Sequence, residues 1–122
     1  MSKKDSFFIK RLKSIGYAFK GAFMLITTEA SLKVQFVIGI LVTIAGFYYD
    51  LSTTEWIIQT LTIALIMSIE GLNTAIEELA DFIHPERHPK IGLIKDLAAG
   101  AVFIFAVAAV IVGIIIYVPK IF

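Results

Sequence analysis

Three long apolar runs divide the chain, and short polar turns separate them. Val34 to Tyr49 contains few polar positions, and Leu97 to Val118 contains no charged residue. Trp56 to Ile69 covers 14 positions, fewer than the roughly 20 residues that a transmembrane helix needs, so this helix must continue past Glu70. The pattern therefore predicts an all-α, integral membrane protein whose residues 1–122 form a single domain. The expected spans are about 33–50, 54–83 and 91–118.

Local signals fix the ends of the middle helix. Ser52-x-x-Glu55 has the form of a capping box, and Pro85 and Pro89 end the helix after about Ile83. A helix of about 30 residues is about 45 Å long, which exceeds the hydrocarbon thickness of about 30 Å. Its second half must therefore emerge on one side of the membrane.

Ahead of the first span, apolar residues recur at spacings of three and four, and most basic residues lie off that stripe. This pattern predicts an amphipathic helix over about 6–28 that lies on the inner membrane surface with its basic side chains toward anionic headgroups. A plain membrane anchor is the alternative. The stripe consists of Phe8, Leu12, Ile15, Phe19, Phe23 and Ile26.

Composition narrows the class of protein. Of the 122 residues, 58% are hydrophobic, and the mean hydropathy of +0.87 is too high for the surface of a soluble domain of this size. The net charge of +1 gives no reason to expect a nucleic-acid partner, and the absence of cysteine excludes disulfides, zinc-thiolate sites and thiol nucleophiles. Neither common glycine-rich nucleotide motif is present.

The distribution of Lys and Arg predicts the topology. The 50–55 turn has no basic residue, whereas basic residues are frequent before the first span and in the loop at 84–96. By the positive-inside rule, the N-terminus and that loop are cytoplasmic, and the 50–55 turn and the C-terminus are outside. The basic residues on the cytoplasmic side are Lys3, Lys4, Lys10, Arg11, Lys13, Lys20, Arg87, Lys90 and Lys95.

The middle helix carries a stripe of oxygen-bearing side chains. Glu70, Asn73, Glu77 and Asp81 follow one another at three, four and four residues, which places them on one face. Glu70 is closest to the hydrocarbon and is a candidate proton acceptor. Asn73 and Thr74 could hold its orientation, or could satisfy polar contacts between helices. The alternatives are a hydrogen bond between helices and an oligomeric protein that translocates protons or cations with Glu70 as the carrier.

Two carboxylates from different helices, Glu29 and Glu77, suit a hard cation such as Mg²⁺. The alternative is that each pairs with a nearby base, for example Glu29 with Lys33. Lys95 and Asp96 are expected to open the third span, where a helix N-terminus and a lysine favour phosphate. Asp96 could accept from ribose or adenine, or cap the helix, and the loop around it could simply be solvated.

Four motifs together resemble the small prokaryotic diacylglycerol kinases and undecaprenol kinases, over nearly the whole chain. The motifs are Gly16-Tyr17-x-x-Lys20-Gly21, Glu29-Ala30, Glu70-x-x-Asn73-Thr74-Ala75-Ile76-Glu77-x-x-x-Asp81 and Lys95-Asp96-x-x-x-x-Ala101-Val102. The resemblance implies ATP-dependent phosphorylation of a membrane lipid alcohol in a bacterial cytoplasmic membrane. It also implies a homotrimer with composite active sites at the subunit contacts.

The resemblance further implies roles for individual residues. Glu70 is the implied general base, and Glu29 and Glu77 are implied to hold Mg²⁺ on ATP. Implied contacts to ATP come from Tyr17, Glu29, Glu77, Glu86, Arg87, His88, Lys95 and Asp96. Implied contacts to lipid or phosphate come from Lys10, Lys33, Glu70, Asn73 and Ala99.

Some positions depart from relatives of this family or stay without a role. Lys10 and Lys33 stand where arginine is familiar, and a lysine lacks the bidentate fork, so phosphate contacts there are expected to be looser. Gln35 replaces an acidic residue found in some members, and no role follows for Asp81. Asn73-Thr74-Ala75 and the His-Pro loop favour undecaprenol over diacylglycerol as the acceptor.

Overall fold

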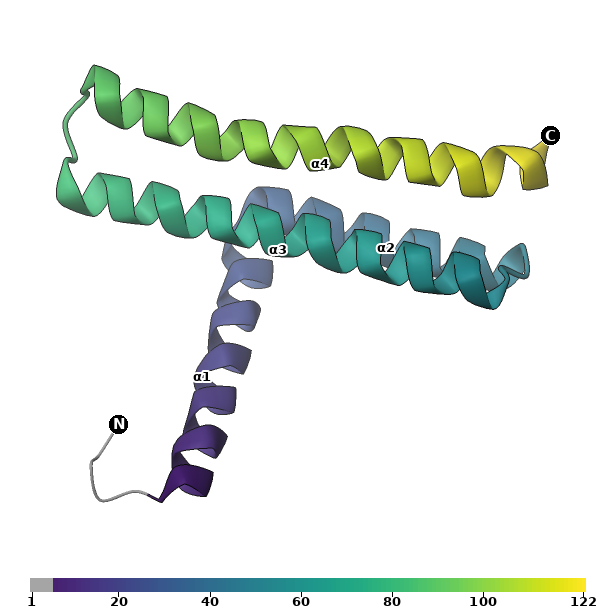
Figure 1. The fold of residues 1–122 in the computed structure, drawn as a ribbon, viewed down its shortest axis with the longest axis horizontal. Coiled ribbons are helices and arrows are strands. Elements are labelled where there is room, and N and C mark those ends of the chain that lie inside the picture. Colours follow the sequence, from purple (N-terminus) through teal and green to yellow (C-terminus); the bar gives the residue numbers. More distant parts are fainter. Residues whose placement is uncertain (1–5) are drawn as a thin grey trace.

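The computed structural model describes residues 6–122, and the basic residues Lys3 and Lys4 lie outside this range. All regular structure in the described part of the chain is α-helical. The helices are α1 (Phe7–Thr28), α2 (Ala30–Tyr48), α3 (Thr53–Ile83) and α4 (Pro89–Ile121). Helix α3 packs against both α2 and α4, whereas α1 projects steeply away from them (Figure 1). The predicted all-α fold, with an N-terminal helix followed by three apolar helices, is confirmed.

Three of the helices, α2, α3 and α4, are long and apolar enough to cross a membrane. Little of their surface is covered by the chain itself. Leu32, Leu51, Ala80 and Ile116 are the buried apolar side chains among the described residues, and many large apolar side chains are exposed. The fold therefore needs an apolar surrounding that hydrocarbon can provide.

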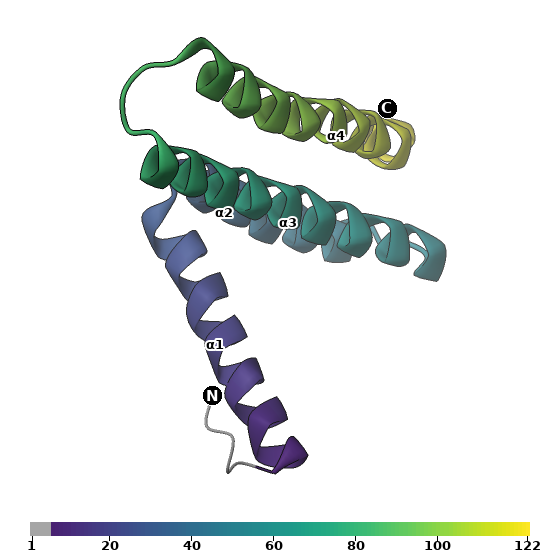
Figure 2. The same ribbon diagram turned by 60° about the vertical axis from the view of Figure 1, so that its left-hand side comes forward.

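The predicted capping box starts α3. The Ser52 hydroxyl accepts from the backbone N–H of Glu55 at 3.2 Å, and the Glu55 carboxylate accepts from the backbone N–H of Ser52 at 2.9 Å. Lys120 near the end of α4 reaches the same carboxylate oxygen at 3.1 Å. This contact ties the end of α4 to the start of α3, at the end of the bundle where α2 turns into α3 (Figure 2).

Helix α4 begins earlier than the sequence predicts. Pro89 is its first residue, and the His88 ring accepts from the backbone N–H of Lys90 at 3.1 Å as the N-terminal cap. Lys95 and Asp96 consequently lie inside the helix rather than at its start. The expectation that they open the helix, and the alternative of Asp96 as its cap, are wrong, because proline at the first helical position and a capping His88 already satisfy the requirements of a helix start.

Helix α3 outruns its neighbour α2. It has 31 residues against 19 in α2, and its C-terminal part extends beyond α2 beside α4 (Figure 1). The end of α1 closely approaches α3 where this part starts: a Cβ added to Gly71 would lie 3.0 Å from the Leu25 side chain. The segment that carries the acidic stripe is thus contacted by the end of α1 near Gly71 and packs beside α4.

Candidate active site

The acidic face of α3, defined by Glu70, Asn73, Glu77 and Asp81, becomes more exposed from Asn73 toward the end of the helix. Asn73 is buried, Glu70 and Glu77 are partly buried, and Asp81 is exposed. The Asn73 amide donates to the Glu77 carboxylate at 3.1 Å, which confirms that these side chains share one face. The amide oxygen of Asn73 is buried without a hydrogen-bond partner in the described part of the chain.

The neighbours of Glu70 do not orient its carboxylate. Thr74 donates to the backbone carbonyl of Glu70 at 3.2 Å, and the side-chain amide of Asn73 bonds to Glu77 instead. The structure shows neither of the two interpretations of Asn73 and Thr74, since neither bonds to the Glu70 carboxylate and both hydrogen bonds lie within α3. The Thr74 hydroxyl bonds to a backbone carbonyl one turn earlier, and the Asn73 amide bonds to a carboxylate one turn later.

Asp81, which the sequence leaves without a role, pairs with Lys95. The ammonium of Lys95 on α4 lies 2.5 Å from the Asp81 carboxylate on α3. Water reaches both side chains and screens the pair, so its contribution to the stability of the fold is small. The contact places the Lys95 ammonium beside the end of α3.

A polar cavity of about 320 Å³ lies between the end of α3 and the start of α4. Four of its lining residues, Glu86, Arg87, His88 and Lys95, are ones that the family resemblance assigns to ATP. Asp81 and His84 also line it, and the sequence analysis did not predict His84. The ring of His84 lies 5.2 Å from that of His88, centroid to centroid, and its Nδ1 is 2.8 Å from the carbonyl oxygen of Glu86. The repeated His-Pro pairs at 84–85 and 88–89 are the sequence signal for it. The cavity is lined by Asp81, His84, Pro85, Glu86, Arg87, His88, Ile91, Gly92 and Lys95.

Other predicted site residues are not at this cavity. Asp96 and Ala99 follow Lys95 on α4 without lining it, and Lys10 and Tyr17 belong to α1, which points away from the bundle (Figures 1 and 2). Tyr17 is 63% exposed. One chain alone therefore supplies only part of the predicted set around the cavity.

Glu29 occupies the junction of α1 and α2. It is partly buried in an extended backbone conformation, and its side chain forms no capping hydrogen bond to α2. Over residues 6–122 it forms no ion pair with Lys33. The alternative interpretation, that Glu29 pairs with this lysine, is therefore wrong. Because Leu25, one turn earlier, contacts α3 at Gly71, the junction lies near the acidic face.

The available ligands fit Mg²⁺ in their chemistry. Within residues 6–122, no group of three or more His, Asp or Glu side chains is arranged to hold a metal by itself. Mg²⁺ is usually held by one or two carboxylates and completes its shell with phosphate oxygens and water. The Glu77 carboxylate acts electrostatically on Lys95, which lines the polar cavity, so Glu77 can supply a ligand of this kind there.

Known proteins match this chain over the residues that form the acidic face, the α1–α2 junction and the polar cavity. The family model described as prokaryotic diacylglycerol kinase matches residues 16–117. The undecaprenol kinase of Bacillus subtilis is 41% identical over 108 residues, which are 88% of each chain. The diacylglycerol kinase of Escherichia coli K12 is 30% identical over 111 residues, 91% of each chain, and that of a Synechocystis species is 35% identical over 103 residues, 84% of this chain and 59% of the relative.

Proposed function

Because this chain belongs to the prokaryotic diacylglycerol kinase family, we propose that it transfers the terminal phosphoryl group of ATP to the hydroxyl of a membrane lipid alcohol. The observation that carries this proposal is the family match over residues 16–117, which contains the acidic face, the α1–α2 junction and the polar cavity. The geometry supports it, since the polar cavity lies beyond the apolar part of the bundle and the acidic face joins the two.

Glu70 is the general base in this proposal. The acceptor oxygen attacks the γ-phosphorus of ATP, the bond from that phosphorus to the β–γ bridging oxygen breaks, and ADP leaves with that oxygen. The proton of the acceptor hydroxyl passes to the Glu70 carboxylate. A carboxylate that no neighbouring amide or hydroxyl holds, at the level where the apolar part of α3 ends, is free to accept it.

Glu29 and Glu77 would hold Mg²⁺, and a cation bound there would supply positive charge beside the phosphates of ATP. Asn73 fixes one oxygen of Glu77 by its hydrogen bond of 3.1 Å, so that the carboxylate keeps one orientation. The bound nucleotide is contacted by Tyr17, Glu86, Arg87, His88, Lys95 and Asp96.

Two lysines and one alanine contact the lipid acceptor or phosphate in this proposal. Lys10 and Lys33 act as point charges toward phosphate or headgroup, and Ala99 leaves room beside the reacting hydroxyl. Since catalysis of phosphoryl transfer is mostly positioning and charge stabilisation, these residues need only align acceptor and ATP. Lys95 exchanges its contact with Asp81 for one with phosphate.

The active enzyme is a homotrimer in this proposal. Lys10 and Tyr17 stand away from the polar cavity of their own chain, and a neighbouring subunit can bring its α1 to that cavity. Helix α1 lies along the cytoplasmic surface of a bacterial cytoplasmic membrane, with its exposed apolar residues in the bilayer. Phe8, Phe19 and Phe23, each at least 70% exposed, support this placement.

Undecaprenol is the proposed acceptor, because the relative at 41% identity carries that activity in its name. The test incubates the purified protein with labelled ATP and either undecaprenol or diacylglycerol. We expect labelled undecaprenyl phosphate to form faster than labelled phosphatidic acid. Faster labelling of diacylglycerol would reverse the choice of acceptor, and labelling of neither lipid would contradict the kinase function.

A further inference from the structure

The loop between α3 and α4, residues 84–88, carries three of the residues proposed to contact ATP but has few bonds of its own to hold it. Glu86, Arg87 and His88 are all exposed. In the described part of the chain, no backbone–backbone hydrogen bond involves Glu86 or Arg87, and neither side chain forms a hydrogen bond or an ion pair. A binding site works best when its residues are held in place, so another group must fix this loop.

His84 supplies that group. Among residues 81–90, all of which the structure describes, His84 alone is partly buried and the rest are exposed. Its Nδ1 lies 2.8 Å from the backbone carbonyl oxygen of Glu86. Because a carbonyl oxygen can only accept, Nδ1 must carry the proton and donate it. This hydrogen bond ties the middle of the loop to the end of α3.

His88 uses the same ring atom in the opposite way. Its Nδ1 accepts from the backbone N–H of Lys90 at 3.1 Å, so the proton of the neutral ring is on Nε2. Both histidines precede a proline and have the extended backbone that this position favours, with φ of −146° at His84 and −143° at His88. The rings meet edge to face, with centroids 5.2 Å apart. The two ends of the loop are thus in contact through two rings of fixed orientation.

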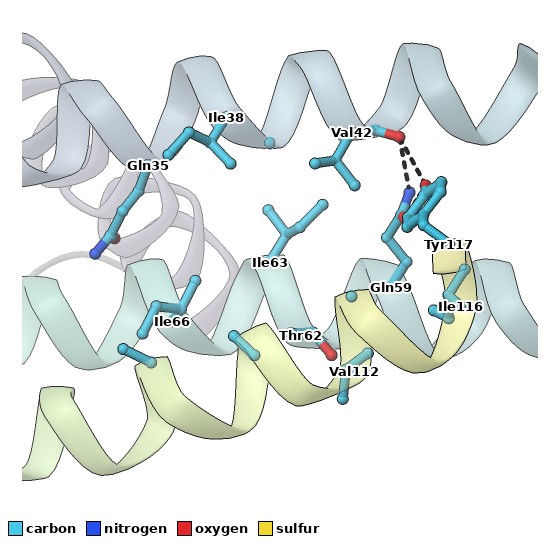
Figure 3. Close-up of a pocket in the computed structure, with 14 residues that line it drawn as sticks. Gln35, Ile38, Val42, Gln59, Thr62, Ile63, Ile66, Val112, Ile116 and Tyr117 are labelled. Atoms are coloured by element: carbon cyan, nitrogen blue, oxygen red, sulfur yellow. Dashed lines mark hydrogen bonds between the residues drawn. The ribbon is translucent and has the colours of Figure 1, made fainter. Parts of the chain in front are cut away.

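Other contacts hold the helices themselves. Far from the loop, the Tyr117 hydroxyl on α4 donates to the Gln59 side chain on α3 at 2.5 Å, at one end of an apolar cavity between α2, α3 and α4 (Figure 3). Beside the loop, Lys95 on α4 pairs with Asp81 on α3. Neither contact involves the His84 ring. Removing that ring should therefore loosen the loop without separating α3 from α4.

We propose that His84 is a positioning residue of the nucleotide site. Its hydrogen bond holds the backbone of Glu86, and so keeps Glu86, Arg87 and His88 in place along the polar cavity that all three line. The inference rests on the proposed kinase function and adds a residue that the family resemblance does not assign. Because a loop that is already held loses less freedom when a ligand binds, His84 increases the affinity for ATP rather than the rate of phosphoryl transfer.

A pair of amide substitutions tests which ring atom matters. His84→Asn places an amide N–H close to the position of Nδ1, where it can still donate to the Glu86 carbonyl, whereas His84→Gln places it close to Nε2. We expect KM for ATP to change by less than about twofold in the Asn variant and to rise about tenfold in the Gln variant, which is about 1.4 kcal/mol and of the order of one hydrogen bond. In both variants kcat and KM for undecaprenol should stay within about twofold of wild type, since the helices keep their other contacts.

Phe82→Leu is the matched control, because it removes an exposed ring two residues earlier that does not line the cavity. Wild-type protein that phosphorylates no lipid alcohol contradicts the proposed function itself. With active wild type, equal KM values for ATP in the Asn and Gln variants, whether unchanged or raised, overturn the role of His84. A fall in kcat or a rise in KM for undecaprenol as large as the change for ATP also overturns it, since that is the pattern of a general loss of structure.

The ring tautomers give a second test that needs no catalysis. The chain contains two histidines, so protein labelled with ¹⁵N-histidine in detergent gives two sets of ring signals. At about pH 9, where both imidazoles are neutral, we expect one ring to be protonated at Nδ1 and the other at Nε2. His84→Asn should remove the Nδ1-protonated set. Two rings protonated at the same nitrogen would contradict the hydrogen bond on which the inference depends, whatever the activity of the protein.

Discussion

Glu70 and Glu77 lie seven residues apart on α3 and differ in what holds them. The Glu77 carboxylate accepts a hydrogen bond from the Asn73 amide at 3.1 Å, whereas neither Asn73 nor Thr74 bonds to the carboxylate of Glu70. A fixed oxygen suits a metal ligand, and a carboxylate without such a bond suits a group that must gain and lose a proton. The proposed roles of the two glutamates follow this difference.

Glu70→Gln tests the general base. The amide keeps the size of the side chain but cannot accept the hydroxyl proton, so we expect turnover to fall by a factor on the order of 10² to 10⁴. Binding of ATP, measured by equilibrium titration, should change little. Glu78→Gln, an exposed residue on the same helix, is the control. Unchanged phosphorylation by the Glu70 variant would remove this residue from the base role.

Glu77→Gln tests the metal ligand. Replacing a carboxylate oxygen by an amide weakens a hard cation site, so the Mg²⁺ concentration for half-maximal activity should rise about tenfold or more. A titration of activity with Mg²⁺ at fixed ATP measures it, with Glu78→Gln again as the control. An unaltered Mg²⁺ dependence in the Glu77 variant would count against a ligand role.

At the scale of helices, local chemistry decides how much could be predicted. The start of α3 and its end at Ile83 were predictable because a capping box and prolines act through neighbours in sequence. The start of α4 carries a local signal as well, because proline favours the first helical position, whereas the ring nitrogen of His88 that caps the helix has no simple motif. The Asp81–Lys95 pair and the Tyr117–Gln59 hydrogen bond join separate helices, so they depend on packing that spacing along one helix cannot give.

Gly46→Ala tests the packing of α2 on α3. A Cβ at this position would lie 2.7 Å from the Trp56 ring, so the helices must move apart or the ring must turn. We expect the free energy of unfolding in detergent to fall by about 1–3 kcal/mol. Gly100→Ala is the matched control, since a Cβ there meets nothing within 4 Å and alanine favours helix. Equal stability of the two variants would contradict close packing at Gly46.

At the scale of the molecule, the two ends of the bundle differ in chemistry. The end with the α2–α3 turn carries aromatic side chains, including a Phe47–Trp56 contact with ring centroids 4.8 Å apart and a Tyr49–Tyr117 contact at 6.1 Å. The other end carries the acidic face and the polar cavity. Aromatic residues gather at both interfaces of a membrane with water, so the first end suits one boundary of the bilayer, and in the proposed orientation this is the outer one.

The proposed orientation predicts which positions a reagent in the medium can reach. The chain contains no cysteine, so single cysteines report without background. Thr54→Cys in the first turn of α3 and Phe122→Cys at the end of α4 should react with a membrane-impermeant maleimide on intact cells, because both lie at the outer end. Lys90→Cys at the start of α4 should react only after permeabilisation, because ATP must reach that end from the cytoplasm. Labelling of Lys90→Cys on intact cells would contradict the proposed orientation, because the acidic face would then lie on the side of the membrane that lacks ATP.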